Sequence, residues 1–166
     1  MELEKPSALR RKEIYRYLAC PENSPAADAL LDRCEADLLA AAQPRGVWRI
    51  LPREQAPASL LLDEGDIARH LEGCSRLVLM AVTLGAGVER LLRRYSATDV
   101  ALATAADAAA SVLVDQMADV LEAHIRSQLA KDHWYMTGRY SPGYGNWPLP
   151  VQADLCRVLD TGRAIG

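Results

Sequence analysis

The pattern of apolar residues predicts an amphipathic helix in the first quarter of the chain. It begins at Ser24-Pro25, a cap residue followed by the residue favoured at the first helical position, and ends before Pro44. Its apolar residues recur at spacings of three and four, and they are Leu30, Leu31, Cys34, Leu38 and Leu39. A shorter helix is predicted before it, over about residues 7–19, and Pro21 ends it.

A second apolar stripe predicts the longest element. Thr98-Asp99 supplies a cap, and the helix runs to about Lys131, roughly 50 Å at 1.5 Å per residue. The stripe consists of Leu102, Ala105, Ala109, Val112, Leu113, Met117, Val120, Leu121 and Ile125. The opposite, polar face carries Asp107, Ser111, Asp115, Glu122 and Arg126. The small side chains of the first half predict close packing against another element.

Shorter apolar runs predict strands. Residues 46–51 and 76–84 are β-rich or continuously apolar, and residues 59–62 are a further candidate. Asp63 is a candidate cap for a short helix to Glu72, residues 88–95 form another helix, and residues 151–159 form the last one. The aromatic-rich segment 133–150 predicts a loop or an edge strand. These elements predict one α+β domain over residues 1–166, with N-terminal helices at about 7–43 and an α+β body at about 46–166.

Composition excludes several classes of protein. A net charge of -3 and a pI near 5.6 argue against nucleic-acid binding, which requires clustered basic residues. Continuous apolar runs fall short of a membrane span and no signal-peptide pattern is present, so we expect a cytoplasmic protein without membrane contact. The four cysteines and three histidines are dispersed, which predicts free thiols and no metal site.

Two near-matches to ligand motifs have simpler interpretations. Gly85-x-Gly87 between a strand and a helix suggests phosphate binding, but Arg90 replaces the third glycine of the dinucleotide motif, so a tight turn is favoured. Ala68-x-His70-x-x-Gly73 differs from the cobalt-ligating motif of corrinoid proteins, because Ala68 replaces the aspartate that orients the imidazole. We therefore do not expect this chain itself to carry cobalamin.

The loop at residues 139–148, RYSPGYGNWP, combines groups suited to holding a ligand. Arg139 offers a planar fork of donors for a carboxylate, while Pro142 and Gly143 form a sharp turn. Tyr144 then adds a ring and a hydroxyl. Judged from the residues alone, a surface loop that closes onto the sheet is an equally good interpretation.

This loop resembles the R-x-x-P-G-Y segment of the activation domains of cobalamin-dependent methionine synthases, especially their short stand-alone forms. The similarity extends over about residues 50–166. It implies helices packed on a mostly antiparallel, twisted sheet, with S-adenosylmethionine as the ligand of the loop. The matching positions are Arg139 for the methionine carboxylate, Ser141 and Gly143 in the loop backbone, and Tyr144 beside the ligand. Asp115 is the nearest match to an acidic residue that the family uses on its long helix.

The resemblance implies a role in repair, in which oxidised cobalamin is reduced and remethylated from S-adenosylmethionine. Cobalamin would be bound only by a partner, a cobalamin-binding protein or other methionine synthase modules. A flavodoxin-like protein is the expected electron donor.

Two features depart from the family pattern. An early aspartate that contacts the ligand in the family has no equivalent in the first half of the chain. Related domains also continue past the equivalent of Gly166 into a further strand with a Pro-Lys-Ser segment, which is absent here. Two alternatives therefore stay open: an interaction module of the same fold without a ligand site, and a reactivation factor for another corrinoid methyltransferase.

Overall fold

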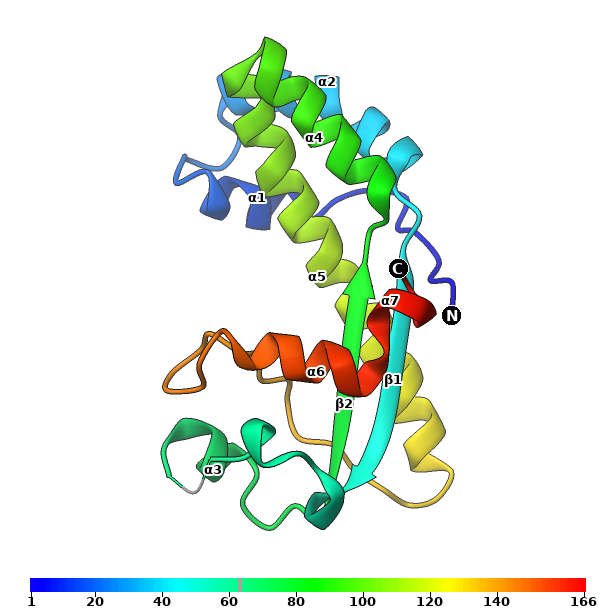
Figure 1. The fold of residues 1–166 in the computed structure, drawn as a ribbon. Coiled ribbons are helices and arrows are strands. Elements are labelled where there is room, and N and C mark those ends of the chain that lie inside the picture. The colour runs from blue at the N-terminus through cyan, green and yellow to red at the C-terminus, as the bar shows by residue number, and fades with distance from the viewer. Residues whose placement is uncertain (63) are drawn as a thin grey trace. The chain divides into compact units, whose positions relative to one another are not determined.

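The structure is a computed structural model that describes residues 1–62 and 64–166. In chain order, its elements are α1 (Arg11–Tyr17), α2 (Pro25–Ala41), β1 (Arg45–Pro52), η1 (Arg53–Gln55), η2 (Ala58–Leu60), α3 (Asp66–His70), β2 (Arg76–Thr83), α4 (Ala86–Thr98), α5 (Val100–Ala130), α6 (Val151–Leu159) and α7 (Thr161–Ala164) (Figure 1). The predicted α+β class is confirmed. The chain divides into unit 1, Met1–Gly46 with Val82–Ala123, and unit 2, Val47–Ala81 with His124–Gly166.

Helix α5 forms the core of unit 1 because its apolar stripe is buried over several turns. The predicted cap is confirmed: the backbone N–H of Leu102 donates to Oδ1 of Asp99 at 3.0 Å. Leu113, Met117 and Leu121 are completely buried. Val120 is an exception to the predicted stripe, since 39% of its surface is exposed.

Helices α2 and α4 pack against each other in unit 1. Leu31, Cys34 and Leu38 of α2 are completely buried, as the spacing predicts. Gly87 at the start of α4 faces the backbone carbonyl of Ala41, and a Cβ at this position would collide with it. The glycine therefore serves close packing of two helices.

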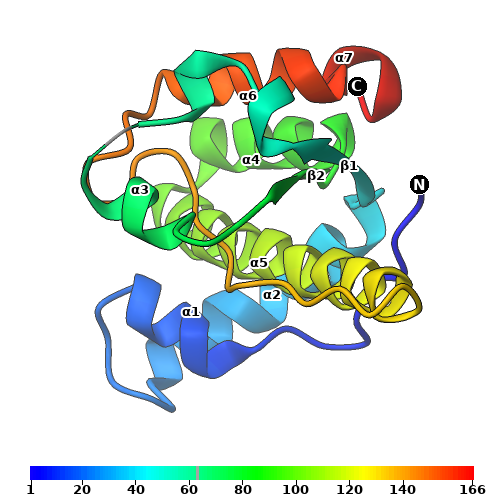
Figure 2. The ribbon, with the colours of Figure 1, turned by 90° about the horizontal axis from the view of Figure 1, so that it is seen from below.

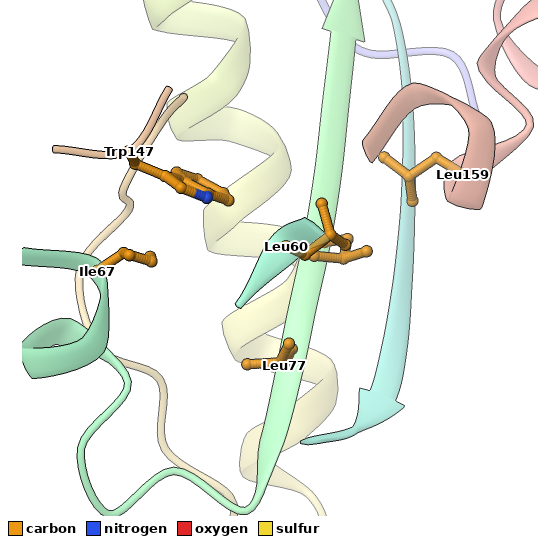
Figure 3. Packing of buried hydrophobic residues seen from close by; sticks show 6 residues of the cluster. Leu60, Ile67, Leu77, Trp147 and Leu159 are labelled. Carbon is orange, nitrogen blue, oxygen red and sulfur yellow. The ribbon is translucent and has the colours of Figure 1, made fainter. Parts of the chain in front are cut away.

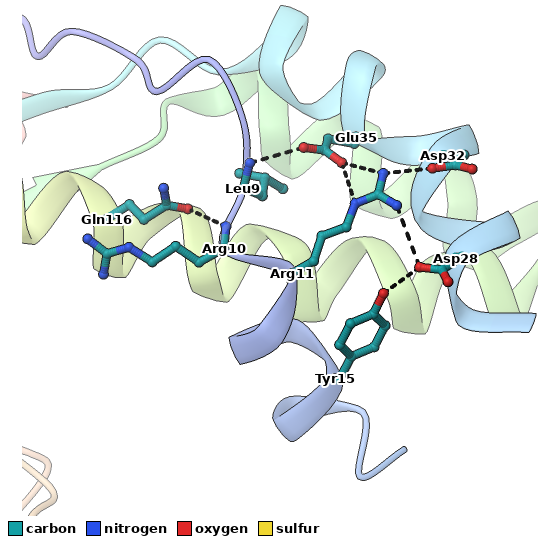
Figure 4. A network of polar contacts seen from close by, with 8 residues as sticks. All are labelled: Leu9, Arg10, Arg11, Tyr15, Asp28, Asp32, Glu35 and Gln116. Atoms are coloured by element: carbon teal, nitrogen blue, oxygen red, sulfur yellow. Dashed lines mark hydrogen bonds and ion pairs between the residues drawn. The ribbon is translucent and has the colours of Figure 1, made fainter. Parts of the chain in front are cut away.

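A charged network holds α1 on α2 (Figure 4). The guanidinium of Arg11 donates to Asp32 at 2.7 Å and to Glu35 at 2.7 and 3.1 Å, and it pairs with Asp28 at 3.6 Å. These hydrogen bonds raise the pKa of Arg11. Tyr15 donates to Asp28, which raises the pKa of the tyrosine.

The first helix begins later than predicted, at Arg11, because residues before it use their backbone donors elsewhere. The N–H of Leu9 donates to Glu35 at 3.0 Å, and the N–H of Arg10 donates to the buried Gln116 at 3.2 Å. Side chains of other helices thus accept hydrogen bonds from these backbone groups, and residues 7–10 do not form a helical turn.

In unit 2, strands β1 and β2 form an antiparallel two-stranded sheet. The strands predicted at residues 46–51 and 76–84 are confirmed. The two strands lie between α6 and the last turns of α5 (Figure 2). The core on the α6 side contains Trp147, which is 5% exposed (Figure 3). The other buried members of this core are Leu60, Ile67, Leu77, Leu79 and Leu159.

One strand prediction for unit 2 is wrong, and one choice that the sequence left open is decided. Residues 59–62 do not form a strand, because Pro57 begins a 3₁₀ turn in which the N–H of Leu60 donates to its carbonyl at 2.9 Å. The segment before α6 is a loop and not an edge strand, since Gly143 and Gly145 adopt left-handed backbone angles. The predicted cap Asp63 lies outside the described residues, and α3 begins after Gly65.

Among the described residues, one helix, α5, is long and apolar enough to cross a membrane, by its length and composition alone. Its 18-residue window has a mean hydropathy of 1.3, and 56% of that window is buried inside the structure. The prediction from the sequence considered only uninterrupted apolar runs. In α5 a few charged residues interrupt those runs, while the many alanines keep the mean hydropathy high. Core helices of soluble proteins share this length and composition, so these two properties do not assign α5 to a membrane.

Candidate functional site

The loop at residues 139–148 is tied to α3 by the side chain of Asn146. Its Oδ1 accepts from the backbone N–H of Asp66 at 2.8 Å, and its Nδ2 donates to the carbonyl of Glu64 at 3.2 Å. A side-chain amide can do this because it carries a donor and an acceptor side by side. The loop is therefore anchored at one residue to a segment 80 positions away in the sequence.

Two glycines permit this close approach. A Cβ at Gly65 would overlap the amide of Asn146, and a Cβ at Gly145 would overlap the Asp66 carboxylate and the Tyr140 hydroxyl. Both glycines have positive φ, of 89° and 52°, which other residues rarely adopt. The anchor thus depends on glycine at both positions.

Three rings lie in a row, two from the loop and one from α3. The ring of Tyr140 is 5.2 Å from that of His70 and 6.0 Å from that of Trp147, measured between centroids. The hydroxyl of Tyr140 donates to the carbonyl of Tyr144 at 3.1 Å, inside the loop. Trp147 is buried, and its indole N–H has no hydrogen-bond partner within the described part of the chain. Ring packing therefore holds the two ends of the loop on α3.

The backbone of the loop also closes on itself. The N–H of Gly143 donates to the carbonyl of Trp147 at 2.8 Å, and the N–H of Tyr144 donates to the carbonyl of Ser141 at 3.2 Å. The Ser141 carbonyl retains a second lone pair, so it can still accept from a ligand. These hydrogen bonds give the loop a defined shape before any ligand is present.

The four predicted ligand residues of the loop all lie at the surface of unit 2. Arg139, Ser141 and Gly143 are exposed, and 69% of Tyr144 is exposed. The loop therefore divides its residues: Tyr140 and Trp147 face inward, whereas the candidate ligand residues face solvent. A guanidinium, free faces of backbone groups and a phenol ring on a pre-shaped turn can together receive a small molecule with a carboxylate and a planar or cationic part.

Asp115 belongs to unit 1, on the exposed face of α5 as the spacing predicts. Its Oδ2 accepts from the hydroxyl of Tyr17 at 3.2 Å. The structure therefore gives this aspartate a partner on α1, within unit 1. Its assignment to the ligand stays a prediction.

The two near-match motifs have structural roles. His70 packs on Tyr140, and its Nε2 lies 3.3 Å from Oγ1 of Thr137. Gly85 caps α4 with a φ of 82°, and its N–H donates to Thr83 at 3.0 Å. Across residues 1–62 and 64–166, no three His, Cys, Asp or Glu side chains are grouped closely enough to hold a metal ion.

Sequence reasoning missed the residues that hold the loop. Asn146, Tyr140 and Trp147 were seen only as parts of a motif, and His70 only as part of a failed cobalt motif. One signal was available: Trp147 is the largest apolar side chain of the loop, and tryptophan is highly buried on average. The partners of Asn146, by contrast, are backbone groups that no side-chain pattern reveals.

Comparison with known proteins does not extend the assignment. A search against protein-family models found no match, and a search of curated proteins found none.

Proposed function

We propose that this chain is an S-adenosylmethionine-binding accessory domain or subunit of a cobalamin-dependent methionine synthase system, with the fold of that enzyme's activation domain. The observation that carries the proposal is the loop at residues 139–148. Its sequence resembles the family's ligand loop, and its candidate ligand residues are exposed on a turn that other residues hold in place.

Each loop residue has a role that suits its chemistry. Arg139 would donate two parallel hydrogen bonds to the methionine carboxylate. Ser141 and Gly143 would contribute backbone groups, and the ring of Tyr144 would lie beside the ligand, where a π face also favours a sulfonium cation. The carboxylate of Asp115 belongs to unit 1 and accepts from Tyr17, so the proposal is carried by the loop residues of unit 2 alone.

On this proposal the chain acts by positioning. S-adenosylmethionine supplies an already activated methyl group, and the loop would hold the donor in one orientation toward a partner's cobalamin. The partner is a cobalamin-binding protein or other methionine synthase modules, and a flavodoxin-like protein is the reductant. We place the system in the cytoplasm and expect neither nucleic acid nor membrane as a partner.

Isothermal titration of the protein with S-adenosylmethionine tests the proposal. Arg139→Ala should lower the affinity about ten- to a hundredfold, because a charge-assisted hydrogen bond contributes about 1.5–3 kcal/mol. Tyr144→Ala should also weaken binding. Arg163→Ala and Tyr135→Ala are matched controls, since both side chains are exposed elsewhere in unit 2. Absence of heat with the unchanged protein would refute the proposal, as would equal affinities for Arg139→Ala and Arg163→Ala.

A second candidate is an interaction module of the same fold that lacks a working ligand site. The exposure of Arg139, Ser141 and Tyr144 favours it, because small-molecule sites usually enclose most of their ligand. Pull-down of a corrinoid protein separates the two candidates: an interaction module binds equally with and without S-adenosylmethionine. A reactivation factor for another corrinoid methyltransferase would bind that enzyme's corrinoid protein in the same assay.

A further inference from the structure

Strand β1 has one edge turned away from β2. At its start, Gly46 exchanges two hydrogen bonds with Met1, of 2.9 and 2.8 Å, on that outer edge. Just beyond its end, the N–H of Arg53 donates to Ser75 on the β2 side at 3.0 Å. Successive residues of a strand direct their backbone groups to opposite edges. The N–H and C=O groups of Trp48 and Ile50 therefore point outward, away from β2.

The outer edge at Trp48 and Ile50 is unpaired in the structure. Within the described residues, no backbone hydrogen bond joins Trp48 or Ile50 to a turn, a loop or another element, and the sheet has two strands. The side chains of Trp48 and Ile50 are only half-buried, and Arg49 between them is exposed. Unpaired strand groups flanked by apolar side chains are a template for another extended segment.

Charge indicates which segment would fit. Arg45, Arg49 and Arg53 recur at every fourth position, and the period of two puts Arg45 and Arg49 on one face of the strand. The chain places an acidic residue across from the first of them, because Glu2 lies opposite Arg45 in an isolated antiparallel backbone bridge. An acidic residue opposite Arg49 would repeat this arrangement, since opposite charges across a ladder are favourable.

A second copy of the chain fits the same edge poorly. The antiparallel register that uses both Trp48 and Ile50 places Arg49 directly opposite Arg49 of the other copy, and like charges there are unfavourable. Shifting the register toward the strand end brings in Pro52, which has no N–H. Shifting it the other way requires Gly46, which is already bonded to Met1.

We propose that the outer edge of β1 at residues 48–50 binds an extended segment of a partner protein by antiparallel strand addition, with a carboxylate of that segment opposite Arg49. Backbone hydrogen bonds to Trp48 and Ile50 supply the affinity, and the charge of Arg49 favours a segment with an acidic residue at the opposite position. This surface lies in unit 2, and the proposal does not depend on S-adenosylmethionine binding.

Amide hydrogen exchange measured by NMR tests the proposal on the whole chain. In the protein alone, the amides of Trp48 and Ile50 should exchange fast, while those of Arg49 and Leu51, which face β2, should be protected. The probe is a capped eight-residue peptide of alternating valine and threonine with one central glutamate. It should slow exchange at Trp48 and Ile50, and the same peptide with a central lysine should bind about two- to fivefold more weakly.

Arg49→Glu is the decisive variant, because an exposed side chain can be changed without loss of the fold. It should reverse the preference, so that the lysine peptide binds more tightly than the glutamate peptide. Three results would overturn the proposal. The first is protection of the Trp48 and Ile50 amides in the protein alone, including protection that rises with protein concentration, as pairing with a second copy would give. The second is no change in exchange with either peptide, and the third is an unaltered peptide preference in Arg49→Glu.

Discussion

Unit 1 and unit 2 are stabilised in different ways. In unit 1 the core is built around one long apolar stripe on α5. Ion pairs of charged side chains, such as that of Arg11 on α1 with Glu35 on α2, join other helices of this unit. In unit 2 the core includes a residue of an irregular loop, Trp147, and the loop is fastened by an amide side chain and a row of rings. Regular helices keep their shape through local hydrogen bonds, whereas an irregular loop needs specific tertiary anchors.

This difference separates the residues that stabilise unit 2 from those proposed to bind a ligand. The anchors Tyr140, Asn146 and Trp147 and the candidate ligand residues Arg139 and Tyr144 are interleaved within ten residues. The anchors contact α3 or the core of unit 2, whereas Arg139 and Tyr144 are exposed. Substitutions in one loop should therefore divide into two groups, those that destabilise the protein and those that affect only binding.

The largest effect is expected from Trp147→Ala. Removing a buried indole from the core of unit 2 should lower the free energy of unfolding by about 3–5 kcal/mol, measured by urea denaturation. Trp147→Phe should cost less, because it keeps most of the ring and removes an N–H that has no partner among the described residues. Trp134→Ala is the control, since 41% of that ring is exposed. Equal losses for Trp147→Ala and Trp134→Ala would show that the loop is not part of the core.

A smaller effect is expected from Gly87→Ala in unit 1. The added methyl group would meet the backbone carbonyl of Ala41, so we expect a loss of about 1–3 kcal/mol in urea denaturation. Gly162→Ala provides the matched control in unit 2. It meets no atom within 4 Å and lies in a helix, so it should be neutral or stabilising. A stabilising Gly87→Ala would contradict the packing role given to this glycine.

A further effect should appear only at acid pH. The pKa of Asp99 is lowered because its carboxylate accepts from the backbone of Leu102 and also pairs with Arg33. Since the folded pKa lies below the unfolded value of about 3.9, this stabilisation is complete at neutral pH. It is lost as the pH falls from that value through the folded pKa.

Urea midpoints measured between about pH 6 and pH 2 test this expectation. Asp99→Asn keeps an acceptor but does not titrate, so its midpoint should fall less steeply with acid. In unit 2 the pKa of Asp154 is lowered, mainly by a hydrogen bond from Ser59 and to a smaller extent by one from Arg157. Asp154→Asn is therefore the corresponding variant for unit 2. Identical acid profiles for Asp99→Asn and the unchanged protein would exclude a role for this cap.

The smallest effect on stability is expected from Tyr144→Ala. The ring is 69% exposed, so the free energy of unfolding should change by no more than about 0.5 kcal/mol. The same variant should weaken S-adenosylmethionine binding in titration calorimetry. A loss of stability comparable to that of Trp147→Ala would show that the two groups of loop residues are not separate.

Much of the fold could be predicted from local patterns. The start of α2 at Pro25, the cap at Asp99, strands β1 and β2, and the bounds of α6 all agree with the prediction. The failures involve competition from other parts of the chain. Residues 7–10 do not extend α1 because Glu35 and Gln116 take their backbone donors, and residues 59–62 turn so that Leu60 can enter the core.

The sequence by itself determined most of the buried apolar stripes of α2 and α5, because the 3.6-residue period is a local property of the backbone. It also placed the candidate ligand groups together, since Arg139, Ser141, Gly143 and Tyr144 are neighbours along the chain. Only the tertiary structure decided how that loop is held and which way its residues face. The anchor of Asn146 joins groups 80 residues apart, and such a contact exists only after the chain has folded.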